Sequence, residues 1–142
     1  MANILLVYWS GTGNTEIMAE KIKEGLEGQG STVDFKTVDQ VEPDDVSSYD
    51  KVVFGCPSMG VEQLEEFEFE PFYGGIKDGL SGKKVVLFGS YGWGDGEWMR
   101  VWEDDVRATG ATLVDAGLIV NETPDDEANK MANALGQALV KA

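Results

Sequence analysis

The stretch Ile4-Leu5-Leu6-Val7-Tyr8-Trp9-Ser10-Gly11-Thr12-Gly13-Asn14-Thr15 joins an apolar run to a small polar loop and leads into a helical pattern. Its last seven residues hold four hydroxyl or amide side chains and two glycines, and none of them is Lys or Arg. A polar loop that opens a helix surrounds an anion with backbone N–H groups, and the helix N-terminus adds about half a positive charge. This stretch therefore predicts a phosphate site without a basic counter-ion.

Apolar runs and helical patterns alternate along the rest of the chain. Five strands are expected, at residues 4–8, 33–38, 51–56, 84–89, and 112–114 with 118–120, the last interrupted by a bend near Gly117. Helices are expected over residues 15–28, 96–109 and 126–141. Apolar central strands and an alternating strand 33–38 predict a parallel sheet with that strand at its edge and helices on both faces. The length suits the doubly wound order 2-1-3-4-5, in which ligands sit beyond the carboxyl ends of strands 1 and 3.

The composition indicates one α/β domain over residues 1–142 and excludes several classes of protein. The formal charge is −15, from 11 Lys and Arg against 26 Asp and Glu, which opposes binding to nucleic acid. This charge gives solubility and favours a monomer, and a docking partner would have to present a basic face. No apolar run approaches the ~20 residues of a membrane span, and the N-terminus has no basic segment of a signal peptide. The single Cys56 fits a reducing compartment, so a cytoplasmic protein is expected.

The loop after the first strand differs from the common nucleotide-binding motifs. It has no Gly-Lys-Ser/Thr sequence, which argues against a triphosphate site. Glu16 stands where the dinucleotide fingerprint needs its third glycine. The alternative is a plain strand-to-helix turn with Thr15 near the N-cap.

Two more unusual loops follow strands 3 and 4 at the same edge of the predicted sheet. In the second loop, residues 57–62, Met59 offers a polarizable surface beside Gly60, and Glu62 can accept a hydrogen bond from a ligand N–H. The alternative is an ordinary turn with Met59 packed inward; the acidic segment 62–70 is expected in this loop region. The third loop, residues 90–96, carries Tyr91 and Trp93 among glycines, which favours stacking on a flat ring. Trp98 and Trp102 lie on a helical pattern and are expected in the core.

Together the three loops resemble those of the flavodoxins, in particular the short-chain clostridial type. The matching stretches are Tyr8-Trp9-Ser10-Gly11-Thr12-Gly13-Asn14-Thr15-Glu16, Gly55-Cys56-Pro57 with Met59-Gly60, and Leu87-Phe88-Gly89-Ser90-Tyr91-Gly92-Trp93-Gly94. The resemblance extends from Met1 to Ala142. It implies a flavodoxin-like fold, tight non-covalent FMN, one-electron transfer between semiquinone and hydroquinone, and an acidic face that docks on basic reductases and electron acceptors.

The resemblance also implies the residues that bind FMN. These are Trp9, Ser10, Gly11, Thr12, Gly13, Asn14, Thr15, Ser58, Met59, Gly60, Val61, Glu62, Ser90, Tyr91, Gly92, Trp93, Gly94, Asp95 and Gly96. The side chains of Ser10, Thr12, Asn14 and Thr15 would hold the phosphate. Met59 would lie on the inner face of the ring and Trp93 would stack on the outer face.

The resemblance also implies contacts with the polar edge of the flavin ring. Glu62 would accept from N3–H, backbone amides near Gly92 would meet O2, and the Gly60 peptide would turn its carbonyl toward N5–H on reduction. The chain departs from the family at two positions. Pro57 replaces a serine that reaches the phosphate in some relatives, so that contact is lost or passes to Ser58, and Val61 replaces an acidic or small polar residue.

The acidity itself predicts a low redox potential once a flavin is bound. A charge about 12 Å from a negatively charged reduced flavin, at an effective dielectric of about 40, costs about 0.7 kcal/mol, or about 30 mV per electron. About five such charges shift the potential by more than ~100 mV before salt screening. The missing Lys or Arg in the first loop leaves this field intact.

Three alternatives remain to be weighed against a carrier. An FMN-dependent NAD(P)H or quinone reductase needs room for a hydride donor, which short loops and Trp93 oppose. A flavodoxin-like activator of ribonucleotide reductase would demand a different composition of the flavin loops. A response-regulator receiver needs an acidic cluster after strand 1 and an Asp at the end of strand 3, where this chain has Tyr8-Trp9 and Cys56.

Overall fold

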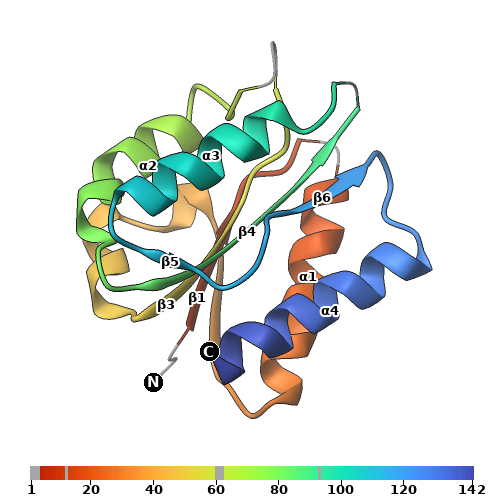
Figure 1. Cartoon of the computed structure of the whole chain (residues 1–142), viewed down its shortest axis with the longest axis horizontal. Helices are drawn as coiled ribbons and strands as arrows, with labels where there is room; N and C mark the ends of the chain where they lie inside the picture. The colour runs from red at the N-terminus through yellow and green to blue at the C-terminus, as the bar shows by residue number, and fades with distance from the viewer. Residues whose placement is uncertain (1–3, 12, 60–62, 93) are drawn as a thin grey trace.

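A computed structural model of the chain describes residues 4–11, 13–59, 63–92 and 94–142, and over these residues it forms one parallel sheet between two layers of helices (Figure 1). The strands run in the order β2-β1-β3-β4-β5, and β6 also pairs with β4. Their bounds are β1 Ile4–Tyr8, β2 Val33–Thr37, β3 Lys51–Gly55, β4 Lys84–Tyr91, β5 Thr112–Leu113 and β6 Leu118–Asn121. The predicted order 2-1-3-4-5 is therefore confirmed.

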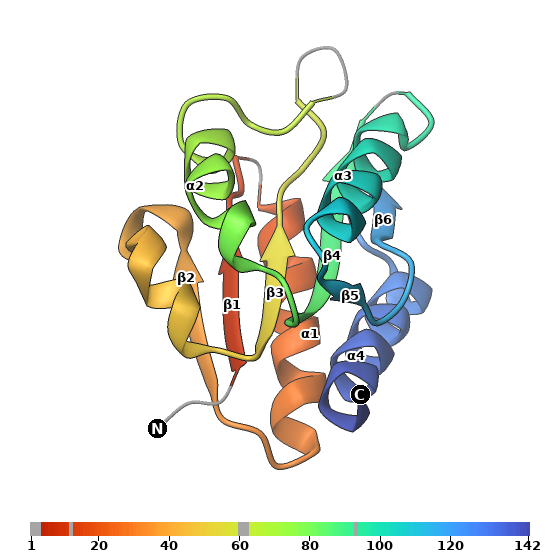
Figure 2. The ribbon, with the colours of Figure 1, turned by 60° about the vertical axis from the view of Figure 1, so that its left-hand side comes forward.

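Helices cover both faces of the sheet. Helices α1 and α4 pack on one face, and α2 and α3 lie on the other (Figure 2). Their bounds are α1 Asn14–Gly28, α2 Phe69–Ile76, α3 Glu97–Ala108 and α4 Asp126–Lys141, with short 3-10 turns η1 Val38–Gln40, η2 Pro43–Ser48 and η3 Lys77–Gly79. No helix among these described segments is long and apolar enough to cross a membrane.

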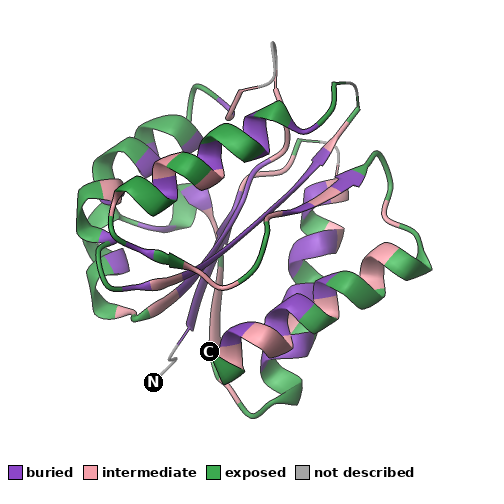
Figure 3. Ribbon diagram, in the orientation of Figure 1, coloured by how far each residue is buried: buried purple, intermediate pink, exposed green. Residues whose placement is uncertain are grey.

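The alternation of side chains along β1 explains why the sheet is buried on both faces. Leu5 and Val7 belong to the core that contains the aromatic side chains of α2 and α3. Ile4, Leu6 and Tyr8 belong to the core shared with α1 and α4. Figure 3 shows the result, with buried strands in the middle and the outer faces of the helices exposed. Because successive side chains point to opposite faces of a strand, both faces of the sheet carry hydrophobic groups that pack against helices. This packing fixes the carboxyl ends of the strands at one edge of the sheet.

The fifth strand differs from the prediction of one strand with a bend. The chain forms two separate strands, β5 beside Lys84 and Val85 and β6 beside residues 88–91 of β4. Between them Gly117 runs so close under α3 that an added Cβ would overlap the side chain of Met99, and its N–H donates to Glu103 Oε2 (2.7 Å). Pairing with β6 also extends β4 through Ser90 and Tyr91, which were expected in a loop.

Helix α2 was not predicted, and several other boundaries differ from the prediction by one residue. The sequence Phe69–Ile76 contains Pro71 and two glycines, which lower helix propensity, so burial of Phe69, Phe72 and Tyr73 decides its structure. Glu70 therefore lies in a helix rather than in a loop. Strands β2 and β3 end at Thr37 and Gly55, one residue earlier than expected, and α1 starts at Asn14 rather than Thr15.

Candidate functional site

The carboxyl ends of β1, β3, β4 and β6 meet at one edge of the sheet and place four loops around a cavity of about 460 Å³. Its described lining consists of Trp9, Gly11, Asn14, Pro57, Ser58, Met59, Ser90, Tyr91, Gly92, Glu122 and Thr123. Eight of these residues are predicted binding residues from all three loops singled out in the sequence. The volume lies in the range of about 300–1,000 Å³ that is usual for small-molecule sites.

The first loop is built to present the N-terminus of α1 to this cavity. Ser10 Oγ accepts hydrogen bonds from the N–H groups of Gly13 (3.1 Å) and Glu16 (3.4 Å), which fixes the turn. Gly13 is the N-cap with φ of 96°, a left-handed conformation that favours glycine. No acceptor for the N–H groups of Asn14 and Thr15 occurs among the described residues. These unpaired donors and the helix dipole suit an anion at this position.

Thr15 connects the first loop to the end of β4. Its side chain is fully buried (0% exposed), and its hydroxyl lies 2.9 Å from the hydroxyl of Ser90. Ser90 is 5% exposed and belongs to the cavity lining, whereas Thr15 does not. The geometry therefore gives Thr15 a supporting position behind Ser90.

A fourth wall comes from the loop after β6, whose residues were not among the predicted binding residues. The Thr123 hydroxyl donates to Asn14 Oδ1 (3.3 Å), and the Glu122 N–H donates to the Tyr91 carbonyl (2.7 Å). Glu122 has φ of 57°, which is uncommon for a residue other than glycine and strains the backbone. The topology offered a signal for this wall, because a strand at 118–120 that is parallel to the others must end at the same edge of the sheet.

Large, flat or polarizable side chains give the cavity apolar walls. Trp9 comes from the first loop, and its indole N–H donates to Glu68 Oε1 (3.1 Å). Tyr91 packs against Trp98, with 5.7 Å between the ring centroids. Met59 is partly exposed in the lining, and its backbone forms a two-bond bridge with Gln63 (2.8 and 2.9 Å). A flat ring system can contact these walls while its anionic tail reaches α1.

A second pocket of about 370 Å³ shares Trp9 and Gly11 with the first, and its lining is acidic. It is lined by Tyr8, Trp9, Ser10, Gly11, Gly13, Glu16, Thr37, Val38, Asp39 and Glu68. Burial, and then the hydrogen bond from its hydroxyl to Glu16 (2.9 Å), raise the pKa of Tyr8 to about 12. Within the described lining of the two pockets there is no Lys or Arg, so the first loop lies in a negative field.

The remaining predicted residues lie away from the cavity or outside the described residues. Asp95 pairs with Arg100 (3.0 Å), and Gly96 is the N-cap of α3. Neither of them, nor Gly94, is part of the described lining. Thr12, Gly60, Val61, Glu62 and Trp93 lie outside the described residues. Trp98 and Trp102 are buried in the core, as predicted.

The turn that leads into α2, residues 65–69, is held by a buried carboxylate. Glu65 is 4% exposed, and its carboxylate accepts from the N–H groups of Phe67 (2.9 Å), Glu68 (2.7 Å) and Phe69 (2.8 Å). Burial alone would raise the pKa of Glu65, but the three backbone hydrogen bonds outweigh it and hold the pKa below its ordinary 4.5. Burial also raises the pKa of the Cys56 thiol, so this cysteine is a packing residue rather than a nucleophile.

Replacing Glu65 by Gln should lower the free energy of unfolding by about 2 kcal/mol at pH 7, because an amide cannot accept all three N–H groups. A lowered native pKa means that the carboxylate stabilises the fold above its unfolded pKa and stops doing so as pH falls through the native value. Urea unfolding should therefore show that Glu65→Gln and wild type differ less in their free energy of unfolding below about pH 4. Glu66→Gln, the same change at an exposed neighbour, is the control; equal stabilities of the two variants at pH 7 would contradict the role of Glu65.

Comparison with known proteins places this chain in a family. A family model described as Flavodoxin matches residues 6–136. The flavodoxin of Megasphaera elsdenii is 47% identical over 137 residues, which cover 96% of this chain and 98% of that protein. The flavodoxin of Clostridium beijerinckii is 50% identical over 121 residues, or 85% of this chain and 88% of that protein.

Solved structures agree with the sequence comparison. The solution structure of two-electron reduced Megasphaera elsdenii flavodoxin superposes with a TM-score of 0.89 at 46% identity, covering 98% of this chain and 99% of that one. A flavodoxin from the domain Archaea superposes with a TM-score of 0.88 at 26% identity, covering 97% and 96%.

Proposed function

This chain belongs to the flavodoxin family of FMN-binding electron-transfer proteins, and from that premise we propose that it cycles its FMN between semiquinone and hydroquinone at low potential. It is an electron carrier rather than an enzyme. The whole of residues 1–142 is proposed to form the FMN-binding domain. The observation that carries the proposal is the cavity of about 460 Å³ at the N-terminus of α1, whose described lining includes Asn14, the first residue of that helix, and no basic side chain.

The described residues fit FMN as a ligand. The N–H groups of Asn14 and Thr15 suit its phosphate, and the Ser90 hydroxyl, supported by Thr15, is within the same lining. Trp9, Met59 and Tyr91 supply apolar surface for the ring system. By family resemblance, Thr12 adds to the phosphate site, Gly60, Val61 and Glu62 lie at the polar edge of the ring, and Trp93 stacks on its outer face.

The charges near the cavity support a low potential. Glu122 belongs to the cavity lining, and Glu16, Asp39 and Glu68 line the second pocket, which shares Trp9 with the cavity. Carboxylates this close to a ring that gains negative charge make the last electron harder to add. The absence of a cation from the described lining leaves their field uncancelled.

The same charges define the proposed partners. A protein of formal charge −15 docks on basic-faced redox proteins, both reductases and acceptors, and repels copies of itself. We therefore expect a monomer, and the single buried cysteine is consistent with a reducing compartment such as the cytoplasm.

A stepwise reduction tests the proposed cycle. The FMN-loaded protein should take up two electrons at separate potentials, with the second potential well below that of free FMN. Neutralising Glu122 by Gln should raise the second potential by about 30 mV or more, because a charge about 12 Å from the ring already gives that shift and Glu122 lines the cavity. Glu27→Gln, at the exposed far end of α1, is the matched control. A second potential equal to that of free FMN, or equal shifts in the two variants, would contradict the electrostatic part of the proposal.

Replacing Trp93 by Ala should weaken FMN binding by about ten-fold or more, since stacking of a heterocycle on an aromatic side chain is worth about 1–3 kcal/mol. Fluorescence titration of the apoprotein measures the dissociation constant, and the potentials should move with it. Phe67→Ala removes an exposed aromatic side chain outside the cavity lining and should leave FMN affinity unchanged. Equal affinity in the two variants would remove Trp93 from the site.

A further inference from the structure

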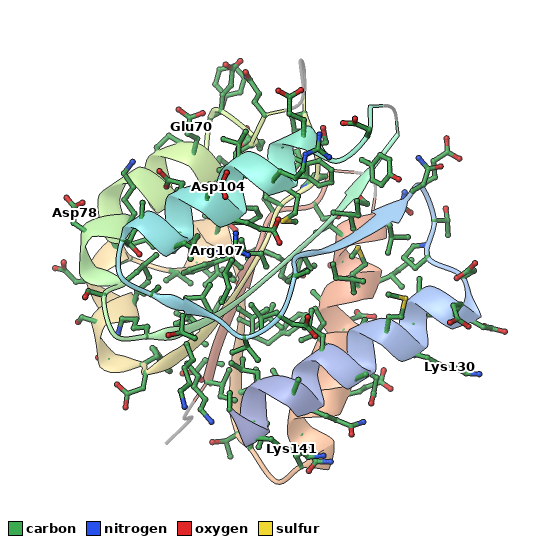
Figure 4. All side chains as sticks on the ribbon, in the orientation of Figure 1. Glu70, Asp78, Asp104, Arg107, Lys130 and Lys141 are labelled. Atoms are coloured by element: carbon green, nitrogen blue, oxygen red, sulfur yellow. The ribbon has the colours of Figure 1, made fainter. Side chains whose placement is uncertain are left out.

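Phe67 is displayed to solvent at the cavity edge of the molecule. Its side chain is 81% exposed, the largest exposure among the big hydrophobic residues that the structure describes. It occupies the turn just before α2 and is flanked by the exposed acidic side chains of Glu66, Glu68 and Glu70. Figure 4 shows Glu70 projecting outward from the start of α2. An aromatic side chain inside an acidic rim has the composition of a docking anchor.

The backbone that carries Phe67 is fixed. The buried Glu65 carboxylate accepts from the N–H of Phe67 itself and from the next two residues. Phe69, two residues after Phe67, is fully buried against Trp102, with 5.5 Å between ring centroids. Phe67 thus points outward between two buried residues, Glu65 and Phe69. Binding to a partner would therefore restrict little more than the side chain of Phe67.

Hydrogen bonding connects this turn to the candidate FMN cavity. Glu68, the neighbour of Phe67, accepts from the indole N–H of Trp9 (3.1 Å), and Trp9 lines the cavity. The other strongly exposed hydrophobic residues described, Val101 and Met131, lie on helices α3 and α4. Of these three residues, Phe67 is the one whose neighbour in the chain, Glu68, contacts a residue of the cavity wall. A partner seated on Phe67 therefore lies beside the redox site.

We propose that Phe67 is the aromatic anchor for a redox protein whose electron-transfer group lies in an apolar recess ringed by basic residues. The inference rests on the proposed function. The ring of Phe67 fills the recess, and Glu66, Glu68 and Glu70 face the basic rim. A second copy of this chain is opposed by like charge, since each copy carries −15.

The test uses the FMN-loaded protein and zinc-substituted cytochrome c, a redox-inert form of a basic haem protein whose haem edge is exposed within a ring of lysines. Calorimetry at low ionic strength gives the dissociation constant. Phe67→Ala should raise it about five-fold or more, the effect of losing a hot-spot side chain. The dissociation constant of Phe67→Trp should stay within about two-fold of the wild-type value because an aromatic anchor remains. Met131→Ala, an equally simple truncation of an exposed side chain on α4, should leave it unchanged.

Charge variants separate the anchor from the rim. Glu66→Gln with Glu70→Gln should flatten the dependence of binding on salt, whereas Phe67→Ala should leave that dependence as in wild type. Dissociation constants for Phe67→Ala and Met131→Ala that agree within error, in proteins that bind FMN normally, would overturn the docking inference alone. A wild-type protein that fails to bind FMN would overturn the proposed function and the inference with it. Sedimentation that shows dimers in wild type and monomers in Phe67→Ala would overturn the partner assigned to this residue.

Discussion

Replacing Asn14 by Asp should weaken FMN binding about 100-fold while leaving the apoprotein at least as stable as wild type. Asp keeps the acceptor that Asn14 Oδ1 offers to the Thr123 hydroxyl (3.3 Å) and changes little else in shape. It adds a carboxylate where the phosphate is proposed to bind. Two charges about 5 Å apart at an effective dielectric of about 20 repel by about 3 kcal/mol, or about two orders of magnitude in affinity.

The apoprotein should respond in the opposite direction. Asn14 is the first residue of α1, where a negative charge favours the helix by about 0.3–1 kcal/mol. Asn133→Asp adds the same charge on α4, packed beside Gly25, about 16 Å along α1 from Asn14 at the rise of a helix. Fluorescence titration should show a large loss of affinity only for the Asn14 variant. A loss below about three-fold would place the phosphate away from α1.

Replacing Gly89 by Ala should lower the free energy of unfolding by about 3 kcal/mol or more. A Cβ at this position would overlap the carbonyl oxygen of Cys56 and lie 3.1 Å from a ring carbon of Trp98. The Cys56 carbonyl also accepts from the Trp98 indole N–H (3.2 Å), so a shift of this carbonyl would disturb that hydrogen bond. The neighbouring bond from the Ser58 N–H to the Ser90 carbonyl (3.0 Å) would lengthen and open the cavity wall.

Urea unfolding of the apoprotein measures this effect. Gly79→Ala is the matched control, because a Cβ there meets nothing within 4 Å. The control should stay within about 0.5 kcal/mol of wild type. A Gly89→Ala protein as stable as the control would mean that β4 and the segment after β3 are packed more loosely than the structure has them.

The fold could largely be predicted because its signals are local and repeated. The apolar runs at 4–8 and 51–56 and the periodic helix 126–141 match the observed elements to within one residue. Helix α2 could not be predicted, since Pro71 and two glycines oppose a helix and burial of its aromatic face overrides them. The separation of β5 from β6 depends on the approach of Gly117 to Met99 of α3, a contact distant in sequence.

The candidate site could be predicted in part, mainly where a loop is polar and unusual in sequence. The family and the FMN cofactor are confirmed by the comparisons, which do not favour the reductase and activator alternatives. The role of Ser10 in fixing the turn, the Thr15–Ser90 pair and the wall formed by Glu122 and Thr123 could not be read from the sequence. The first depends on the path of the backbone within its own loop, and the other two depend on distances between residues of different loops, which only the folded sheet determines.

The most direct test of the FMN site is a fluorescence titration of FMN with apoprotein. Wild type should quench the flavin fluorescence at a stoichiometry of one FMN per chain, and Asn14→Asp should need about 100-fold more protein for the same quenching. Wild-type apoprotein that leaves the fluorescence of micromolar FMN unchanged would contradict the account.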